Sequence, residues 1–415
     1  GDSSVYLRTL GDMVIAGAGD GTRSRILNSV GGDNWFTLWT DHTAINLVSA
    51  GGNMAPSKVA IDSSASVHDV ADTWPATLRV AALGGNLYFG HSAGADNMRT
   101  YTHDVLAPSP SGALSILAAG SIYGGTFFPS DPYMARHALV MSTTGTRLPT
   151  PFDPAFTGQG TSNVDPFGGA GRDIRGATYS LFAFGPNTAA TAAPRGGDAE
   201  PIRIYAVNGD IVGLSTGEML TYEKPWWIGG DLPTWYVGGG PLRMRAGRDI
   251  VSSGSLDLAW ASVPFKGGVP NLIVHSNATD VSTIQAGRDI LYSSFVVAGP
   301  GTLEIDAGRH ILMEDKGAAT SIGTIVAGDK RPGASIAMAA GLGAAGPDYA
   351  RLAALYLDPA NLARTGVPLA DQPGKVAKTY EQELANWLAT TFGFAGSTDE
   401  ARAMFARLPA EQQRV

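Results

Sequence analysis

The chain has 415 residues, with 54 glycines, 25 prolines, no cysteine, 16% charged residues and a formal net charge of −8. Without cysteine no disulfide can form, and the acidic balance disfavours nucleic acid as a partner, because nucleic-acid binding requires a clustered basic surface. No run of about 18 apolar residues could span a membrane, and residues 1–8 lack a signal-peptide pattern. The chain starts inside a repeat and stops without a helix-stop signal, so we expect an interior fragment or a processed piece of a larger protein.

A short sequence motif recurs along the chain. In this motif a small residue, a glycine, a polar residue and an apolar residue follow one another. Its clearest copies lie at 246–250, 286–290 and 307–311, with an earlier copy at 170–174. Weaker copies keep the same order, with the polar position at Asp12, Asp33, Asn53, Asn86, Ser121, Asp210 and Asp231. Many successive polar positions are 18 to 21 residues apart, as from Asp210 to Asp231 and on to Asp249. A fixed period of this length indicates a repeat protein.

The motif is predicted to form a corner between β-strands. Residues 282–286 and 302–307 alternate polar and apolar side chains, which is typical of strands and not of helices. The glycine would supply a positive φ, the aspartate would bond its own backbone, and the isoleucine would re-enter the core. We therefore assign structural corner roles to Gly247, Asp249, Gly287, Asp289, Gly308 and His310, where the histidine replaces the aspartate.

Strands that return at this period and stack at the spacing of a sheet predict an all-β fold. We expect a parallel β-helix over residues 1–346, with about ten to thirteen coils of about 20 residues each. Three stretches rich in proline, glycine or small polar residues interrupt the pattern, near 90–110, 129–166 and 185–201. Loops of this length in a compact fold are commonly functional, so binding is expected there rather than at the corners.

Residues 347–415 carry helical patterns instead. A first helix is predicted to open at 347–349 and a second to span about 375–392, with its apolar residues on one stripe. Ser397 and Glu400 have the spacing of a capping box, and Pro409 suits the first turn of a further helix. We expect this helical domain to cover the last coil and hide its open edge.

Neither a catalytic centre nor a metal or cofactor site is predicted. The chain has no adjacent pair of aspartates of the kind that polysaccharide hydrolases use, and its seven histidines lack metal-ligand spacing. The recurring aspartates occupy the corner position, where a structural role is expected. A polysaccharide-degrading enzyme stays open as an alternative, because β-helices also host such enzymes.

Two further groups of side chains are candidates for surface roles. Arg248, Arg288 and Arg309 follow the corner glycine, and in successive coils they would repel unless carboxylates pair with them. We expect a paired, solvent-facing ladder. Aromatic residues crowd a short segment and could bind a glycan or a partner, or could pack against the coil wall: Tyr222, Trp226, Trp227, Trp235 and Tyr236.

Several segments resemble the C-terminal region of filamentous-haemagglutinin-like large exoproteins. The segments are 201–212, 297–309, 339–343, 347–349 and 356–361. The resemblance is strong from about 200 to 413 and only compositional before. It implies a right-handed β-helix, export through an outer-membrane transporter and a place outside the cell or on its surface. The chain departs from the family in lacking a secretion domain and a recognisable toxin.

Together these observations predict a non-enzymatic secreted or surface-anchored bacterial exoprotein segment, a rigid β-helical stalk for adhesion or cell contact. The expected partners are the outer-membrane transporter during export, a receptor or glycan on a host or neighbouring cell, and another copy of the chain. A self-assembling extracellular filament subunit is the second alternative, because an uncapped stack of coils exposes sheet edges.

Overall fold

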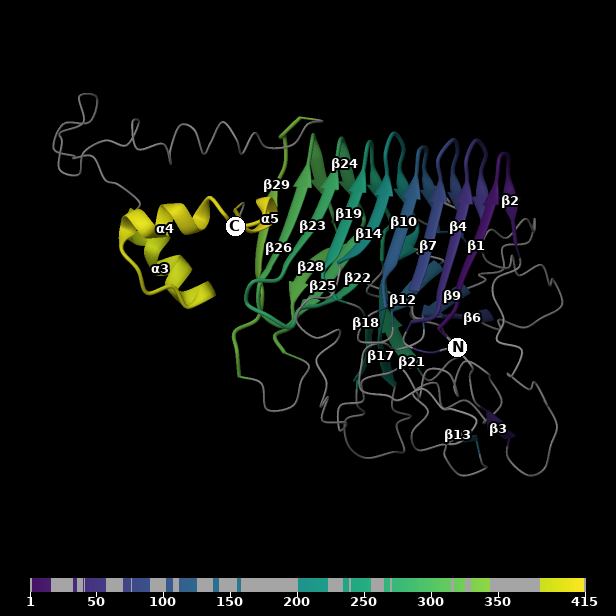
Figure 1. Ribbon diagram of the computed structural model, residues 1–415, viewed down its shortest axis with the longest axis horizontal. Coiled ribbons are helices and arrows are strands. Elements are labelled where there is room, and N and C mark those ends of the chain that lie inside the picture. Colours follow the sequence, from purple (N-terminus) through teal and green to yellow (C-terminus); the bar gives the residue numbers. More distant parts are fainter. Residues whose placement is uncertain are drawn as a thin grey trace.

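The computed structural model of the chain describes residues 2–15, 33–35, 40, 42–56, 70–75, 77–89, 102–106, 112–124, 137–141, 155–157, 201–222, 234–238, 240–254, 265–268, 271–314, 317–324, 330–343 and 381–413. Most of this part is built from parallel β-sheets, and a small helical group lies at the C-terminal end (Figure 1).

The largest sheet has nine parallel strands, and its order follows the sequence (Figure 1). Its strands are β1 (Ser4–Thr9), β4 (Ala44–Ser49), β7 (Thr77–Ala82), β10 (Leu114–Ala118), β14 (Ile202–Ala206), β19 (Leu242–Ala246), β23 (Val281–Ala286), β26 (Thr302–Ala307) and β29 (Ser335–Ala339). Each long strand lies directly beside the next, so residues far apart in the sequence become neighbours, as Leu117 and Tyr205 do.

A corner and a short strand follow each of the first eight long strands. The short strands form an eight-stranded parallel sheet made of β2 (Met13–Val14), β5 (Met54–Ala55), β8 (Leu87–Tyr88), β11 (Ile122–Tyr123), β15 (Ile211–Val212), β20 (Ile250–Val251), β24 (Asp289–Leu291) and β27 (His310–Leu312). Most are only two residues long, yet they keep register because one of the two side chains, such as Ile250, is buried.

Further strands follow the short ones. One parallel sheet has four strands, β6 (Val70–Trp74), β9 (Thr102–Leu106), β12 (His137–Met141) and β16 (Leu214–Ser215). Another parallel sheet has three strands, β22 (Asn271–Val274), β25 (Ser294–Ala298) and β28 (Ala318–Ser321). An antiparallel sheet is formed by β17 (Gly217–Tyr222), β18 (Thr234–Gly238) and β21 (Phe265–Gly268). A second antiparallel sheet pairs β3 (Asp33–Trp35) with β13 (Ala155–Thr157). The succession of long, short and third strands is compatible with a β-helix.

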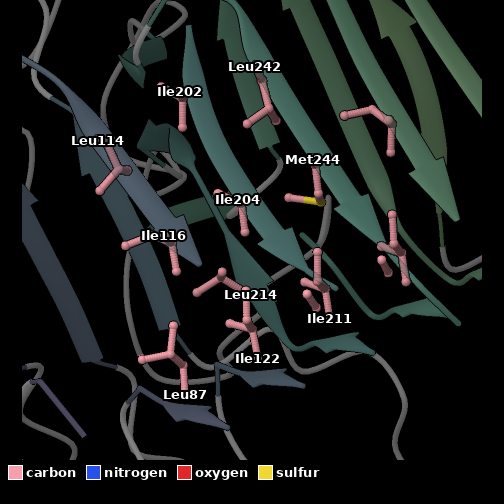
Figure 2. Packing of buried hydrophobic residues seen from close by; sticks show 14 of the residues in the cluster. Leu87, Leu114, Ile116, Ile122, Ile202, Ile204, Ile211, Leu214, Leu242 and Met244 are labelled. Carbon is pink, nitrogen blue, oxygen red and sulfur yellow. The ribbon is translucent and has the colours of Figure 1, made fainter. Parts of the chain in front are cut away.

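The core lies between these sheets, where alternate side chains of each strand point inward. Figure 2 shows inward residues of neighbouring strands, among them Ile116, Ile204 and Met244, which are at most 1% exposed. Their register is continuous, since Ile116 pairs with Ile204 and Ile204 with Met244. The period-two pattern of the sequence therefore places one apolar column behind the sheet.

The period of about 20 residues holds for one step and is wrong for the others. From Asp289 to His310 the chain advances 21 residues between equivalent corners. The other steps take 33, 35, 39, 40, 41 and 89 residues. The reason is that most turns carry additional chain, which includes the hairpin β17–β18. Asp33, read as a corner, lies instead on β3, which pairs antiparallel with β13.

Two of the three predicted loop insertions contain β-strands. Strand β9 lies within 90–110 and strand β12 within 129–166, and both belong to a parallel sheet. The interruptions there are therefore shorter than the sequence suggested. Three other predicted features lie outside the described residues. They are the interruption at 185–201, apart from residue 201, the copy of the motif at 170–174 and the helix expected from 347.

The C-terminal helices are α3 (Glu381–Phe392), α4 (Thr398–Phe405) and α5 (Ala410–Gln413). Helices α3 and α4 pack on each other around Leu388 and Ala401. The predicted capping box is confirmed: Ser397 accepts from the Glu400 N–H, and Glu400 accepts from the Ser397 N–H at 2.7 Å. The latter hydrogen bond lowers the pKa of Glu400.

The helices do not bury the last long strand. Met338 of β29 stays 46% exposed, and Ser335 and Ala337 are exposed as well. Gln412 of α5 donates a hydrogen bond to the carbonyl of Thr279, in the turn between β22 and β23, at 3.2 Å. The expectation that the tail covers the last coil is therefore wrong for β29. Within the described ranges no helix is both long and apolar enough to cross a membrane.

Candidate functional site

The corner residues form a continuous hydrogen-bonded ladder. In each step the side-chain oxygen at the polar corner position accepts the backbone N–H of the equivalent residue in the next turn, at 2.7 to 3.2 Å. The ladder runs through Asp12, Asn53, Asn86, Ser121, Asp210, Asp249, Asp289 and His310. The aspartates were expected to bond their own backbone, and that expectation is wrong. Their role is to join one turn to the next.

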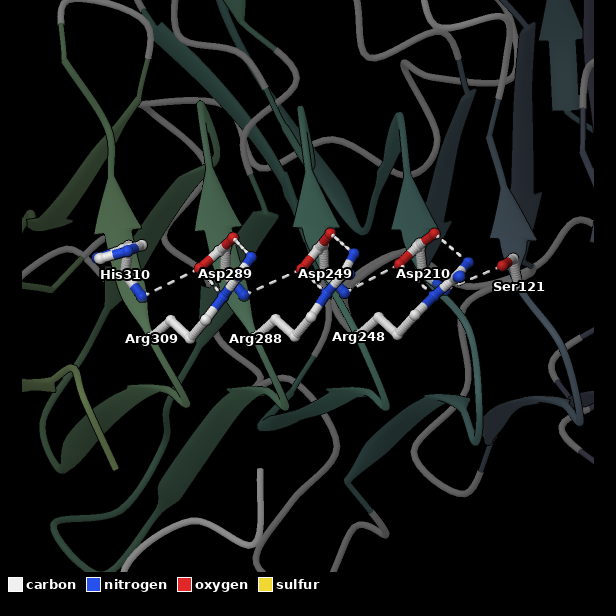
Figure 3. Close-up of polar contacts among 8 residues, drawn as sticks. All are labelled: Ser121, Asp210, Arg248, Asp249, Arg288, Asp289, Arg309 and His310. Carbon is white, nitrogen blue, oxygen red and sulfur yellow. Dashed lines mark hydrogen bonds and ion pairs between the residues drawn. The ribbon is translucent and has the colours of Figure 1, made fainter. Parts of the chain in front are cut away.

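Three arginines form ion pairs with the ladder aspartates Asp210, Asp249 and Asp289, as expected (Figure 3). Arg248 donates two hydrogen bonds to Asp210, with the shorter at 2.6 Å, and Arg309 donates two to Asp289, with the shorter at 2.5 Å. Arg288 pairs with Asp249 in the same way, and this hydrogen bond raises the pKa of Arg288. The corner carboxylates are thus engaged in inter-turn bonds.

The corner glycines are required for close approach and not for a positive φ. None of Gly247, Gly287 and Gly308 has a positive φ. A Cβ at Gly287 would instead lie 2.2 Å from the Gly247 carbonyl oxygen, and one at Gly308 would lie 2.0 Å from the Gly287 oxygen. Glycine at this position therefore lets the backbones of successive turns touch.

A positive φ recurs at the next corner, after the short strand. Gly213, Ser252 and Tyr292 occupy this position in three successive turns, with φ of 65°, 49° and 50°. Serine and tyrosine adopt this conformation only at a cost of about 1–3 kcal/mol, which the surrounding structure must offset. Three different residue types occupy this corner, so no repeated motif marks it in the sequence.

A buried histidine links two turns of the chain. The ring of His275 lies 2.7 Å from the Ser282 hydroxyl and 2.8 Å from the Pro300 carbonyl, and Ser282 also accepts the Leu242 N–H at 2.9 Å. Burial lowers the pKa of His275, although the charge of Asp280 opposes this. His275 is 3% and Ser282 0% exposed, so a substrate cannot reach this pair, and its role is structural.

The predicted aromatic cluster is only partly described. Tyr222 lies on β17, and Trp235 and Tyr236 lie on β18, where Trp235 pairs with Leu220. Trp226 and Trp227 lie outside the described residues. The strands place three of the five aromatic residues in one antiparallel sheet.

A group of arginines that the sequence analysis did not single out lies on the outward side of the nine-stranded sheet. Arg203 of β14 pairs in register with Arg243 of β19, and Arg245 follows two residues later on the same face. Arg79 of β7 occupies the same register, with Ser115 of β10 between it and Arg203. The signal was present in the alternating sequences of 202–206 and 242–246, because every second residue shares a face.

Metal binding finds no support in the described ranges, where no group of three or more His, Cys, Asp or Glu side chains could hold an ion. No family model matches the chain, and no curated protein or solved structure is similar enough to count as a match.

Proposed function

We propose that the chain is a right-handed parallel β-helical segment of a secreted or surface-anchored exoprotein, a rigid stalk for adhesion or cell contact without enzymatic activity. The observation that carries this proposal is the corner ladder from Asp12 to His310, which bonds every turn to the next. The resemblance to filamentous-haemagglutinin-like exoproteins supports it and adds an outer-membrane transporter as the partner during export.

The physical argument concerns stiffness. Successive turns share parallel backbone hydrogen bonds in at least two sheets, a side-chain ladder at one corner and a continuous apolar core. Bending the stack would break bonds of all three kinds at once, because each turn contacts only its neighbours. A stiff rod of this kind can hold surface loops away from a cell, which is what an adhesive stalk must do.

The test is attachment of the purified chain to surfaces. Beads coated with the chain should bind to cultured cells or to a glycan array, whereas beads coated with heat-unfolded chain should not. Surface labelling of intact source cells with an antibody, abolished by external protease, would support the location. An absence of binding to every cell type and glycan would contradict the adhesive role.

The enzymatic alternative is tested on the same preparation. Incubation with a panel of polysaccharides should leave their molecular mass unchanged, because the corner aspartates Asp210, Asp249 and Asp289 are held in inter-turn ion pairs. Shortening of any polymer by the native chain, and not by the unfolded one, would replace the adhesive proposal by an enzymatic one.

The filament alternative is favoured by one observation, the apolar surface of the first described turn. Val5 and Leu7 are 44% and 43% exposed, and Leu10 and Val14 are 88% and 77% exposed, along the open edges of β1 and β2. Sedimentation at rising concentration should then show growing assemblies. Val5→Asp and Leu7→Asp together should reduce them, and a monomer at every concentration would exclude the filament.

A further inference from the structure

The first described turn, formed by β1, its corner and β2, ends the stack with an apolar surface. Leu7 pairs in register with Leu47, and Val5 lies two residues earlier on the same side of the strand. Leu47 is fully buried in the core, whereas Val5 and Leu7 are 44% and 43% exposed. Repeat proteins close their stacks with turns whose outer surface is polar, and exposed edge strands are commonly protected by proline or by several charges. Strand β1 has no proline and a single charge, at Arg8, so its surface resembles an interior one.

The corner of this turn carries a donor without an acceptor. In every step of the ladder, the side chain of one corner accepts the backbone N–H of the next corner. Asp12 accepts the Asn53 N–H in this way at 2.7 Å, but within the described part of the chain nothing accepts the N–H of Asp12 itself. At the other corners the acceptor is Asp, Asn or Ser, so a side chain of one of these types is what the Asp12 N–H would bind.

Gly11, directly before this corner residue, shows the same asymmetry. A Cβ on the equivalent Gly52 would lie 2.4 Å from the Asp12 nitrogen, and one on Gly85 would lie 2.6 Å from the Gly52 oxygen. A Cβ on Gly11 would meet no atom within 4 Å. In the second and third turns the glycine is explained by the backbone of the turn before it. Gly11 is the same residue type at the same place, and it would allow the same close approach.

The last turn of a second copy does not match this surface. The nine-stranded sheet ends at β29, whereas the eight-stranded sheet ends one turn earlier, at β27, so in the described ranges no short strand accompanies β29. The residues after β29, at 340–343, are alanine, leucine and two glycines, which offer no side-chain acceptor. The surface of β1 and β2 calls for a long strand, a corner acceptor and a short strand at one level, which a complete turn of the repeat provides.

We infer that β1, Gly11, Asp12 and β2 form the docking surface for one further parallel turn of this repeat, N-terminal to β1 in the same polypeptide and with Asp, Asn or Ser at its corner. Its two strands extend both sheets by main-chain hydrogen bonds, and its inward residues cover Val5 and Leu7. Its corner side chain accepts the Asp12 N–H, and its backbone lies against Gly11. This inference concerns how the stack is extended and does not depend on the adhesive role.

The test places a turn of known sequence at this surface. Residues 44–76 carry β4, β5 and β6 and lead directly into β7, so they form one complete turn. A second copy of these residues, placed directly before Ser4 of the full chain, should slow amide hydrogen exchange in β1 by about tenfold or more, because β1 gains a neighbouring strand. The same residues in scrambled order are the control and should leave exchange in β1 fast. Exchange in β14 and β19 should stay unchanged in both chains, which shows that the stack is folded.

Two variants separate the specific interface from a general covering of the end. Gly11→Ala should leave the urea midpoint of the original chain unchanged but remove the added protection in the extended chain, because the Cβ then meets the added corner. Asn53→Ala, confined to the added copy, removes the acceptor for the Asp12 N–H and should speed exchange of that amide.

Three outcomes would overturn the inference. They are fast exchange in β1 of the extended chain, equal protection by the scrambled residues, and protection that survives Gly11→Ala. Protection of β1 in the original chain that grows with its concentration would also count against it, since a second copy would then occupy the surface.

Discussion

At the scale of single residues, the corner glycines make a sharp prediction. Gly287→Ala should destabilise the fold by about 2–3 kcal/mol, because the new Cβ would lie 2.2 Å from the Gly247 oxygen and the two turns would have to separate. Gly11→Ala is the matched control, since a Cβ there meets no atom within 4 Å. Urea denaturation of both variants measures the difference, and equal midpoints would refute the close-approach explanation.

A second residue-scale prediction concerns pH. Because burial lowers the pKa of His275 in the folded chain, the unfolded chain takes up its proton first. The stability that the neutral ring contributes is therefore complete above the ordinary pKa of about 6.5 and is lost as the pH falls below it towards the lowered folded value. Thermal unfolding between pH 8 and pH 5 should show this loss.

The histidine variants isolate the effect from other titrating groups. His275→Gln should flatten the profile in that window, because it removes the buried group whose pKa is lowered by folding. His310→Gln, at an exposed corner, should leave the profile of the wild type in place. A wild-type profile that is already flat between pH 6.5 and pH 5 would contradict the prediction.

The sequence indicated which corner residues matter but not why. Gly287 and Asp289 stood out through repetition, yet a repeat reveals only that a position is constrained. The constraint is a contact with the neighbouring turn, which depends on knowing which segments become neighbours. His275 gave no signal at all, because its partners Ser282 and Pro300 belong to the following strand and to the turn beyond it.

At the scale of elements, the α4 capping box allows a local prediction. Ser397→Ala should cost the helical pair about 1 kcal/mol, because the Glu400 N–H loses its acceptor, whereas Ser397→Thr should be nearly neutral. Hydrogen exchange should speed up over 381–408 and stay unchanged in β23 and β26, since the pair has a core of its own. Faster exchange in the strands as well would show that the helices stabilise the sheets.

Elements differed in how far the sequence could reveal them. The α4 boundary was predictable, because the spacing of Ser397 and Glu400 encodes a cap within four residues. The long strand β26 was predictable from its alternation. The short strand β20 was not, since two residues carry no period, and only its pairing with β15 and β24 defines it.

At the scale of the whole molecule, the stacking of parallel strands followed from the repeat, but the length of a turn did not. The ladder passes from Asp210 directly to Asp249, 39 residues further on. The copy of the motif at Asp231 lies outside the described residues. The added chain within each turn is invisible to a period count, because a stack tolerates insertions between strands as long as the corners stay in register.

The same architecture predicts a gradient of local stability along the stack. In the nine-stranded sheet, β1 and β29 each have one neighbouring strand and expose apolar side chains, whereas β14 and β19 have two neighbours and inward residues at most 2% exposed. Opening an end costs one set of inter-turn bonds, while opening the middle costs two. Amide hydrogen exchange followed by mass spectrometry should therefore be fastest in β1 and β29 and slowest between β10 and β23. Uniform exchange along the sheet would show that the stack unfolds only as a single unit.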